Sequence, residues 1–169
     1  IEKTPDMEGR SLAGVIRSDD MARDAALFGM FGCHVCVTDG RYVYMRGIGD
    51  GDNTPLCQYT YMPMHLYNMF SVEELQTAEL ADPFPFTKGC RPMKIRSGRW
   101  VDRDTHARIG YVDAEHIHEN LLFDLETDPG QLHPMNDPAL EAEMLEKLVD
   151  LMRKNGAPPE QYERLKIRL

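Results

Sequence analysis

Three side chains in two loop segments have the chemistry to contact an anionic ligand. Lys88 and Arg91 belong to residues 86–91, and His65 belongs to residues 62–65. Lys and Arg pair with oxyanions through charge-assisted hydrogen bonds, and His changes its charge near neutral pH. Loops carry binding roles more often than the elements that they join. The sequence therefore predicts substrate contact at His65, Lys88 and Arg91, with ordinary surface charge as the alternative for each.

Two further patterns have the spacing of redox or metal sites. Cys33 and Cys36 are three residues apart, but the segment is predicted to be a strand, where such residues point to opposite faces. Buried thiols are therefore the simpler interpretation. His116 and His118 would share one face of an extended segment, yet no third ligand occurs at a suitable spacing. We expect no metal site in this chain, with zinc at the two histidines as the alternative.

The charge of the chain restricts the classes of partner that it can bind. The 169 residues carry a formal net charge of −9, and the one basic cluster in the sequence is Arg164, Lys166 and Arg168. Nucleic-acid binding needs a clustered basic face, so we expect no nucleic-acid partner and a solvated C-terminal segment. No apolar run reaches the roughly 18 residues that a membrane span needs, so no membrane association is expected.

Strands are predicted where apolar and β-branched runs are bounded by turn residues. The clearest hairpin joins residues 28–37 to residues 41–46 through an Asp-Gly turn, a strong hairpin signal. Residues 56–61 and 121–125 are further strands, which would complete an antiparallel sheet of about four strands. Residues 47–53, between the hairpin and the third strand, are expected to form a solvent-exposed turn.

Helices are predicted from capping residues and apolar spacing. Ser71 and Glu74 form a capping box, which begins a helix that we expect to reach about Leu80. Asp137 caps a longer helix, Pro138–Lys154, whose apolar residues recur every three or four positions and form one stripe. The predicted fold class is therefore α+β, with this amphipathic C-terminal helix packed on one face of the antiparallel sheet.

Three segments resemble the sulfatase family in their residues and in their order along the chain. Residues 122–131, followed by Asn-Asp-Pro and a helix, resemble the family's C-terminal signature, with Phe and Gln where the family has Tyr and Glu. Residues 37–44 are similar to the family's Asp-Gly-Arg-Tyr hairpin, with Val43 in place of Lys. Residues 5–12 are similar to the segment that joins the catalytic domain to the tail.

The resemblance implies that residues 25–169 are the small C-terminal domain of an arylsulfatase-like hydrolase. Residues 1–24 would be a linker that joins this domain to a missing catalytic domain. That catalytic domain would be the partner of this chain, and it would hold the Ca²⁺ and the formylglycine. In this family the tail domain supports the fold and walls the substrate pocket. The face that meets the catalytic domain should be apolar, with Met62, Met64 and Met69 contributing, and could also support homo-oligomers.

One short segment is similar to the family motif that supplies the formylglycine. Residues 90–94 have Lys94 where the family has Arg, and they lack the following helix whose N-terminus would face the anion. We therefore expect no catalytic residue and no cofactor in this chain. The alternative function is a stand-alone protein-interaction module with the same fold. A third is a small metal-binding protein that uses His116, His118 and a cysteine.

Overall fold

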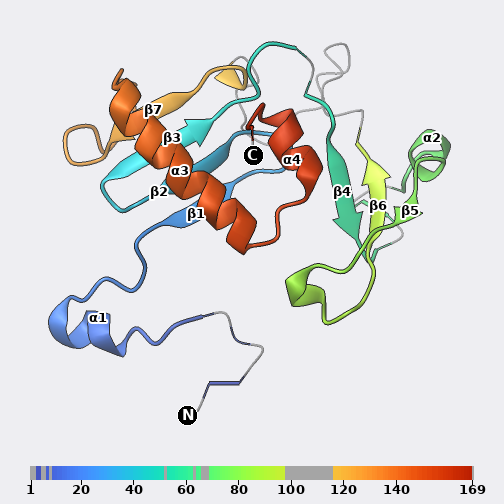
Figure 1. Cartoon of the computed structure of the whole chain (residues 1–169), viewed down its shortest axis with the longest axis horizontal. Coiled ribbons are helices and arrows are strands. Elements are labelled where there is room, and N and C mark those ends of the chain that lie inside the picture. The colour runs from blue at the N-terminus through green and yellow to red at the C-terminus, as the bar shows by residue number, and fades with distance from the viewer. Residues whose placement is uncertain are drawn as a thin grey trace.

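The chain folds as an α+β protein with two antiparallel sheets and a long C-terminal helix (Figure 1). This architecture comes from a computed structural model that describes residues 3, 4, 7, 9–51, 53–62, 64, 65, 69–97 and 116–168. The predicted fold class is confirmed at this level. Within the described residues, no helix combines the length and the apolar character that crossing a membrane requires.

The first sheet has four strands in the order β1-β2-β3-β7. Its strands are β1 (Ala26–Gly29), β2 (Val35–Thr38), β3 (Tyr42–Arg46) and β7 (Leu121–Asp124). The predicted Asp-Gly turn is confirmed, since Gly40 has a φ of 98° and the Asp39 carboxylate accepts the backbone N–H of Tyr42 at 2.8 Å. The prediction of one strand over residues 28–37 is wrong. Gly32, at a φ of 75°, lies in a turn that divides this stretch into β1 and β2.

The second sheet has three strands in the order β4-β6-β5. Its strands are β4 (Cys57–Thr60), β5 (Glu79–Leu80) and β6 (Met93–Arg96). The prediction that residues 56–61 join the first sheet is therefore wrong, because β4 pairs with β6 instead. The capping box at Ser71 is confirmed, but α2 (Val72–Leu75) is far shorter than predicted. The chain leaves α2 through a turn, and Glu79 and Leu80, which were expected at the end of the helix, form β5 and pair with β6.

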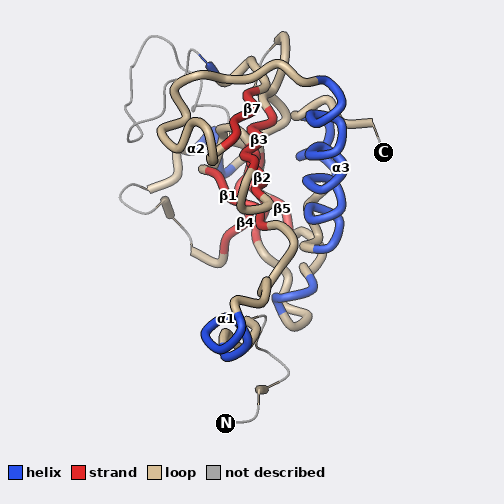
Figure 2. The backbone as a smooth tube through the Cα atoms, turned by 90° about the vertical axis from the view of Figure 1, so that its left-hand side faces the viewer, coloured by secondary structure: helices blue, strands red, loops and turns tan. Residues whose placement is uncertain are grey.

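The helix α3 (Pro138–Lys154) has the predicted bounds and lies along one face of the four-stranded sheet (Figure 2). The Asp137 carboxylate accepts the backbone N–H groups of Ala139 and Leu140, both at 3.1 Å, which confirms the predicted cap. The predicted apolar stripe is also confirmed. Its buried residues pack on apolar residues of β2, β3 and β7, and the shared cluster includes Met144, Leu148, Met152, Val37, Tyr44 and Leu122.

A short helix that the sequence did not predict, α4 (Pro159–Arg164), follows α3. Two consecutive prolines, Pro158 and Pro159, follow α3, and proline is unfavourable in the interior of a helix. Proline is favoured in the first turn of a helix, however, so α4 begins at Pro159 in a new direction. The turn between the helices needs Gly156, which has a φ of 70° and approaches Pro85 so closely that a Cβ would lie 2.9 Å from its ring.

Residues before the first sheet form an arm that carries α1 (Ala13–Ser18). Both views show α1 apart from the sheets, beyond the β1 end of the molecule (Figures 1 and 2). None of the α1 residues is buried. The assignment of residues 1–24 as a linker stays a prediction.

Two expectations about exposure are wrong in part, although Lys166, Arg168, Asp50 and Gly51 are exposed as expected. Arg164 was expected in a solvated C-terminal segment, but it is 3% exposed. Residues 47–53 were expected to form a solvent-exposed turn, but Ile48 and Asn53 are 2% and 4% exposed. Arg164 and Asn53 are buried together, because the Arg164 guanidinium donates a hydrogen bond to the Asn53 side chain at 2.9 Å, whereas Ile48 is buried in the hydrophobic core.

The substitution Leu148→Ala tests whether α3 holds the four-stranded sheet. Leu148 has no exposed surface, so its truncation leaves a cavity and should lower the free energy of unfolding by about 2–5 kcal/mol in urea denaturation. Leu132→Ala is the matched control, because Leu132 is 74% exposed, and should change that free energy by less than about 0.5 kcal/mol. Equal effects of the two substitutions would contradict this packing.

Candidate functional site

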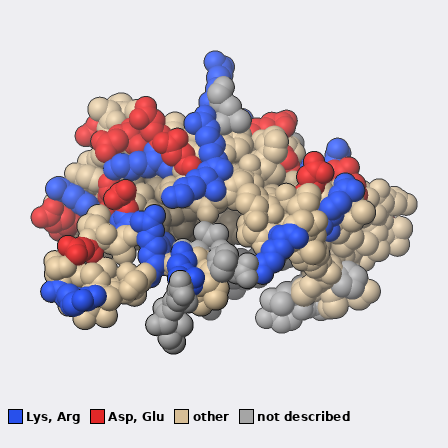
Figure 3. Space-filling model, turned by 60° about the horizontal axis from the view of Figure 1, so that its bottom comes forward, with Lys and Arg blue, Asp and Glu red and all other residues tan. Residues whose placement is uncertain are grey.

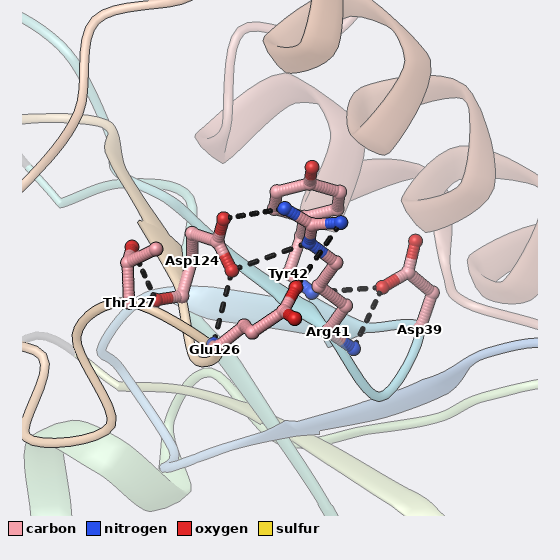
Figure 4. Close-up of polar contacts among 6 residues, drawn as sticks. All are labelled: Asp39, Arg41, Tyr42, Asp124, Glu126 and Thr127. Carbon is pink, nitrogen blue, oxygen red and sulfur yellow. Dashed lines mark hydrogen bonds and ion pairs between the residues drawn. The ribbon is translucent and has the colours of Figure 1, made fainter.

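Two of the three sulfatase-like segments lie side by side in the structure. They pair as adjacent strands, with Tyr42 of β3 opposite Asp124 of β7. The Arg41 guanidinium forms two hydrogen bonds to the Asp124 carboxylate, at 2.9 and 3.3 Å, and reaches Glu126 at 3.2 Å (Figure 4). The hydrogen bonds from Arg41 hold the pKa of Asp124 below its ordinary value. The third segment, residues 5–12, lies partly outside the described residues.

The same turn is tied to the helix on the sheet. The Lys147 ammonium on α3 lies 2.8 Å from the Asp39 carboxylate and 2.9 Å from that of Glu143. Burial raises the pKa of Asp39, but the hydrogen bonds from Lys147 and from two backbone N–H groups outweigh it and hold that pKa below its ordinary value. The cluster of Asp39, Arg41, Asp124 and Lys147 therefore connects the hairpin turn, β7 and α3. We call these four residues the hairpin cluster.

His65, a predicted substrate contact, lies beside α2. Its Nε2 atom is 2.9 Å from the Glu74 carboxylate, and its ring lies against that of Phe70 with the centroids 4.3 Å apart. Burial raises the pKa of Glu74, but the Ser71 N–H and His65 outweigh it and lower that pKa. Glu74 is also the capping-box residue, so His65 stabilises the start of α2 in addition to any contact with a ligand.

Arg91 and Lys88, the other predicted contacts, lie on the loop that leads into β6. Arg91 donates hydrogen bonds to the backbone carbonyls of Ala81 and Leu80, at 3.1 and 2.9 Å, and its side chain is 53% exposed. Lys88 is the C-cap of the short helix η1 (Pro85–Thr87) and has a φ of 52°. His65 and Arg91 thus have different protein partners, and substrate contact stays a prediction for all three residues.

The cysteines are all free thiols in different surroundings. Cys36 is buried in β2, where burial raises the pKa of its thiol to about 11, and Cys33 lies in the preceding turn rather than in a strand. Cys90 is exposed, and the formylglycine-like residues that follow it enter strand β6 and not a helix. The residues that follow Cys90 in the described part of the chain therefore form a strand, where the family motif has the N-terminus of a helix.

His116 and His118 make backbone and side-chain contacts near the loop that begins at Gly47. His118 Nδ1 lies 2.8 Å from the Gly49 carbonyl, and His116 lies 3.8 Å from the Glu119 carboxylate. Among the described residues, no group of three or more His, Cys, Asp or Glu side chains is arranged to hold a metal ion. The Ca²⁺ that the sulfatase resemblance implies was expected in the missing catalytic domain, and that expectation stays a prediction.

Sequence reasoning missed a polar junction between α4 and the three-stranded sheet. The Tyr59 hydroxyl donates a hydrogen bond to the Glu160 carboxylate, and the Lys94 ammonium lies 3.2 Å from the same carboxylate. The Glu160 side chain is 11% exposed. Burial and Glu160 both raise the pKa of Tyr59, so its phenol stays protonated and acts as the donor. No spacing in the sequence links residues 59, 94 and 160.

The same helix makes a second buried polar contact at its other end. Arg164 donates hydrogen bonds to Asn53 Oδ1 at 2.9 Å, to the Cys33 carbonyl at 3.1 Å and to Gln161 Oε1 at 3.1 Å. The Asn53 amide in turn donates to the Gly32 carbonyl at 2.7 Å. These acceptors are neutral, and burial lowers the pKa of Arg164. Arg164 therefore fastens α4 to the turn between β1 and β2.

Large apolar side chains are exposed mainly in two parts of the chain. One part is the arm with β1 and its turn: Met7, Leu12, Ile16, Met21, Phe28, Met30 and Phe31. The other surrounds the three-stranded sheet: Tyr61, Met62, Met69, Val72, Leu75, Leu80 and Phe86. Of the methionines expected on a docking face, Met62 and Met69 are 46% and 72% exposed, whereas Met64 is half-buried and pairs with Met69.

No protein-family model matches this chain, and no curated protein matches it.

Replacing Glu160 with Gln should loosen the three-stranded sheet. The change keeps an acceptor for Tyr59 but removes the charge that pairs with Lys94. Hydrogen-exchange protection in β4 and β6 should fall about tenfold, the equivalent of roughly 1.4 kcal/mol for a charge-assisted contact. Glu163→Gln removes the same charge from an exposed position of α4 and should leave that protection unchanged.

The effect of Glu160→Gln should also depend on pH. Burial raises the pKa of Glu160, but Tyr59 and Lys94 outweigh it and hold that pKa below its ordinary value. The carboxylate therefore stabilises the junction above about pH 4.3, the ordinary pKa of Glu, and this contribution is lost as the pH falls through the lower pKa of the folded protein. A difference in protection between the native protein and the variant that persists in full near pH 3 would contradict this role.

Thiol labelling should distinguish Cys90 from the other cysteines. An aryl disulfide reagent at pH 8 should react rapidly with one thiol, since Cys90 is exposed and burial raises the pKa values of Cys33, Cys36 and Cys57. Cys90→Ser should abolish the rapid phase, and Cys33→Ser, the control, should retain it. A rapid phase that survives Cys90→Ser would contradict the burial of the other thiols.

Proposed function

We propose that this chain is the C-terminal domain of a sulfatase-like hydrolase. In that role it supports the fold of the enzyme and walls the substrate pocket, and it is not catalytic alone. The observation that carries the proposal is the pairing of the two sulfatase-like segments. Segments about 80 residues apart in the sequence meet as adjacent strands and are joined by the ion pair of Arg41 with Asp124. A chance likeness in two segments gives no reason for them to meet in this way.

The arrangement around this pair also supports the proposal. The resemblance implies a small antiparallel sheet with a helix on one face, and α3 lies in that position on the four-stranded sheet. The signature residues continue into the Asp137 cap and α3, and Lys147 returns to the hairpin turn. The segments therefore belong to one structural unit, which is what a domain signature describes.

The exposed apolar residues support a large partner. Val72, Leu75, Leu80 and Phe86 are each between 47% and 67% exposed, and all belong to the three-stranded sheet or the segments that flank it. A large contiguous apolar patch usually marks a protein-interaction site, and exposed apolar residues on neighbouring segments are what such a patch would require. In the proposed function they meet the catalytic domain of the same polypeptide, which also supplies the Ca²⁺ and the formylglycine.

His65, Lys88 and Arg91 are the proposed contribution of this domain to the pocket wall. Arg91 is the best placed of them, because its backbone contacts use Nε and Nη2 and leave Nη1 without a hydrogen-bond partner among the described residues. A guanidinium held at one edge can present its other edge to an oxyanion. His65 would change its charge near neutral pH and so make substrate contact depend on pH.

The proposal is tested with the complete reading frame that contains this chain. Its product should carry an upstream Cys/Ser-x-Pro-x-Arg motif and hydrolyse 4-nitrophenyl sulfate with Ca²⁺, whereas the 169 residues alone should not. Intact mass should show formylglycine at the upstream motif and an unmodified Cys90. Arg91→Gln in the complete enzyme should raise KM more than it lowers kcat, and Arg96→Gln, an exposed cation on β6, is the control.

Two results would overturn the proposal. One is sulfate-ester hydrolysis by the 169 residues alone, which would require a nucleophile that the proposal places elsewhere. The other is a reading frame without the upstream motif. That second result would favour the alternative of a stand-alone interaction module, which would use the same exposed apolar residues to bind another protein.

A further inference from the structure

A half-open hollow lies between α3 and the C-terminal segment that follows α4. It has a volume of about 450 Å³ and is lined by residues of α3, by Lys166, Ile167 and Arg168, and by Arg46 of β3. Pockets that hold small organic ligands span roughly 300–1,000 Å³. The hollow includes none of the three predicted substrate contacts, and the inference drawn from it does not depend on the proposed function.

Positive charge exceeds negative charge around this hollow. Its lining includes four cationic side chains, from Arg46, Arg153, Lys166 and Arg168, and two acidic ones, from Glu146 and Asp150. The chain as a whole carries a net charge of −9, so the charge of the lining of the hollow is opposite in sign to that of the whole chain. Figure 3 shows Lys and Arg side chains gathered in a strip beside a group of acidic side chains.

Two of these cations keep their charge available to a ligand. Lys166 and Arg168 are exposed, and neither forms an ion pair with an acidic side chain in the part of the chain that the structure describes. The Lys166 ammonium lies over the loop of Gly49, where a Cβ would be 3.5 Å from it. Arg153 pairs with Asp150 at 3.5 Å, but both side chains are more than half exposed, so this pair is weak.

Arg46 fixes the geometry of the hollow. Its Nε and Nη2 atoms donate hydrogen bonds to the Leu165 carbonyl, at 3.1 and 3.0 Å, and so hold the C-terminal segment against β3. Leu165 itself is fully buried. The backbone that carries Lys166 and Arg168 is therefore positioned before a ligand binds, which lowers the entropy that binding must overcome.

The remaining wall of the hollow is apolar. Leu145, Val149 and Ile167 line it, and each is half-buried and packs on the core beneath. We propose that this hollow binds a small organic anion, with its aromatic or alkyl body on Leu145, Val149 and Ile167 and one sulfate or phosphate group between Lys166 and Arg168. The acidic side chains of the lining repel additional negative charge, so a ligand with one anionic group fits better than a polyanion.

Calorimetric titration with 2-naphthyl sulfate and 2-naphthyl phosphate tests this proposal. A ligand of this size should bind with a Kd on the order of 1 mM, and inorganic sulfate should bind at least about tenfold more weakly, since it lacks the apolar body. The double variant Lys166→Gln/Arg168→Gln should weaken naphthyl-ester binding about tenfold or more. Arg10→Gln/Arg23→Gln removes two exposed cations from the N-terminal arm and is the control with the same net charge.

A second variant separates the apolar contact from the charge. Val149→Thr keeps the shape of the side chain and adds a polar group, so it should weaken the naphthyl esters severalfold and leave inorganic sulfate unchanged. Tighter binding of either ester supports the site and identifies its head group. Three results would each overturn the proposal. They are an equal loss of ester affinity in the two double variants, an equal affinity for inorganic sulfate and the esters, and no saturable ester binding below about 10 mM.

Discussion

The contact between α3 and the four-stranded sheet is the one on which the rest of the structure depends. Met144 and Leu148 of the helix and Tyr44 of β3 have no exposed surface. Tyr44 can be buried because its hydroxyl is paired with the Glu141 carboxylate at 3.0 Å, and burial raises the pKa of that hydroxyl to about 12. Asn120 donates to the same carboxylate at 2.9 Å, so the chain entering β7 is fixed by the same helix.

The polar contacts at the hairpin determine geometry more than stability. Arg41 is 53% exposed, and exposed ion pairs contribute only about 0–1 kcal/mol each. These ion pairs mainly fix the relative position of the elements. Arg41 donates two hydrogen bonds to the Asp124 carboxylate, and this two-point contact opposes any shift of β3 along β7. Lys147 pairs with Asp39 and opposes rotation of α3 in the same way. The hairpin cluster thus specifies register and helix angle at one end of the sheet.

The features that the sequence predicted correctly are those with local causes. The Asp137 cap, the bounds of α3 and the Asp-Gly turn depend on residues within one helical turn or one hairpin. The partner of β4 could not be predicted, because strand pairing between residues nearly 40 apart leaves no local signal. The short length of α2 could not be predicted either, because Glu79 and Leu80 pair with β6 and are therefore not available to extend the helix. His65 and Arg91 lie outside the named helices and strands, and their partners Glu74 and the Leu80 carbonyl were not foreseen.

The position of α4 has a mechanical consequence. Glu160 reaches Tyr59 and Lys94 in the three-stranded sheet, and Arg164, four residues later, reaches Asn53 and the Cys33 carbonyl beside the four-stranded sheet. Residues four apart lie about 6 Å from one another along a helix, so the two sets of contacts are joined by about one rigid helical turn. A displacement of the three-stranded sheet relative to the β1–β2 turn would therefore have to break the contacts of Glu160, break those of Arg164, or move α4 as a whole.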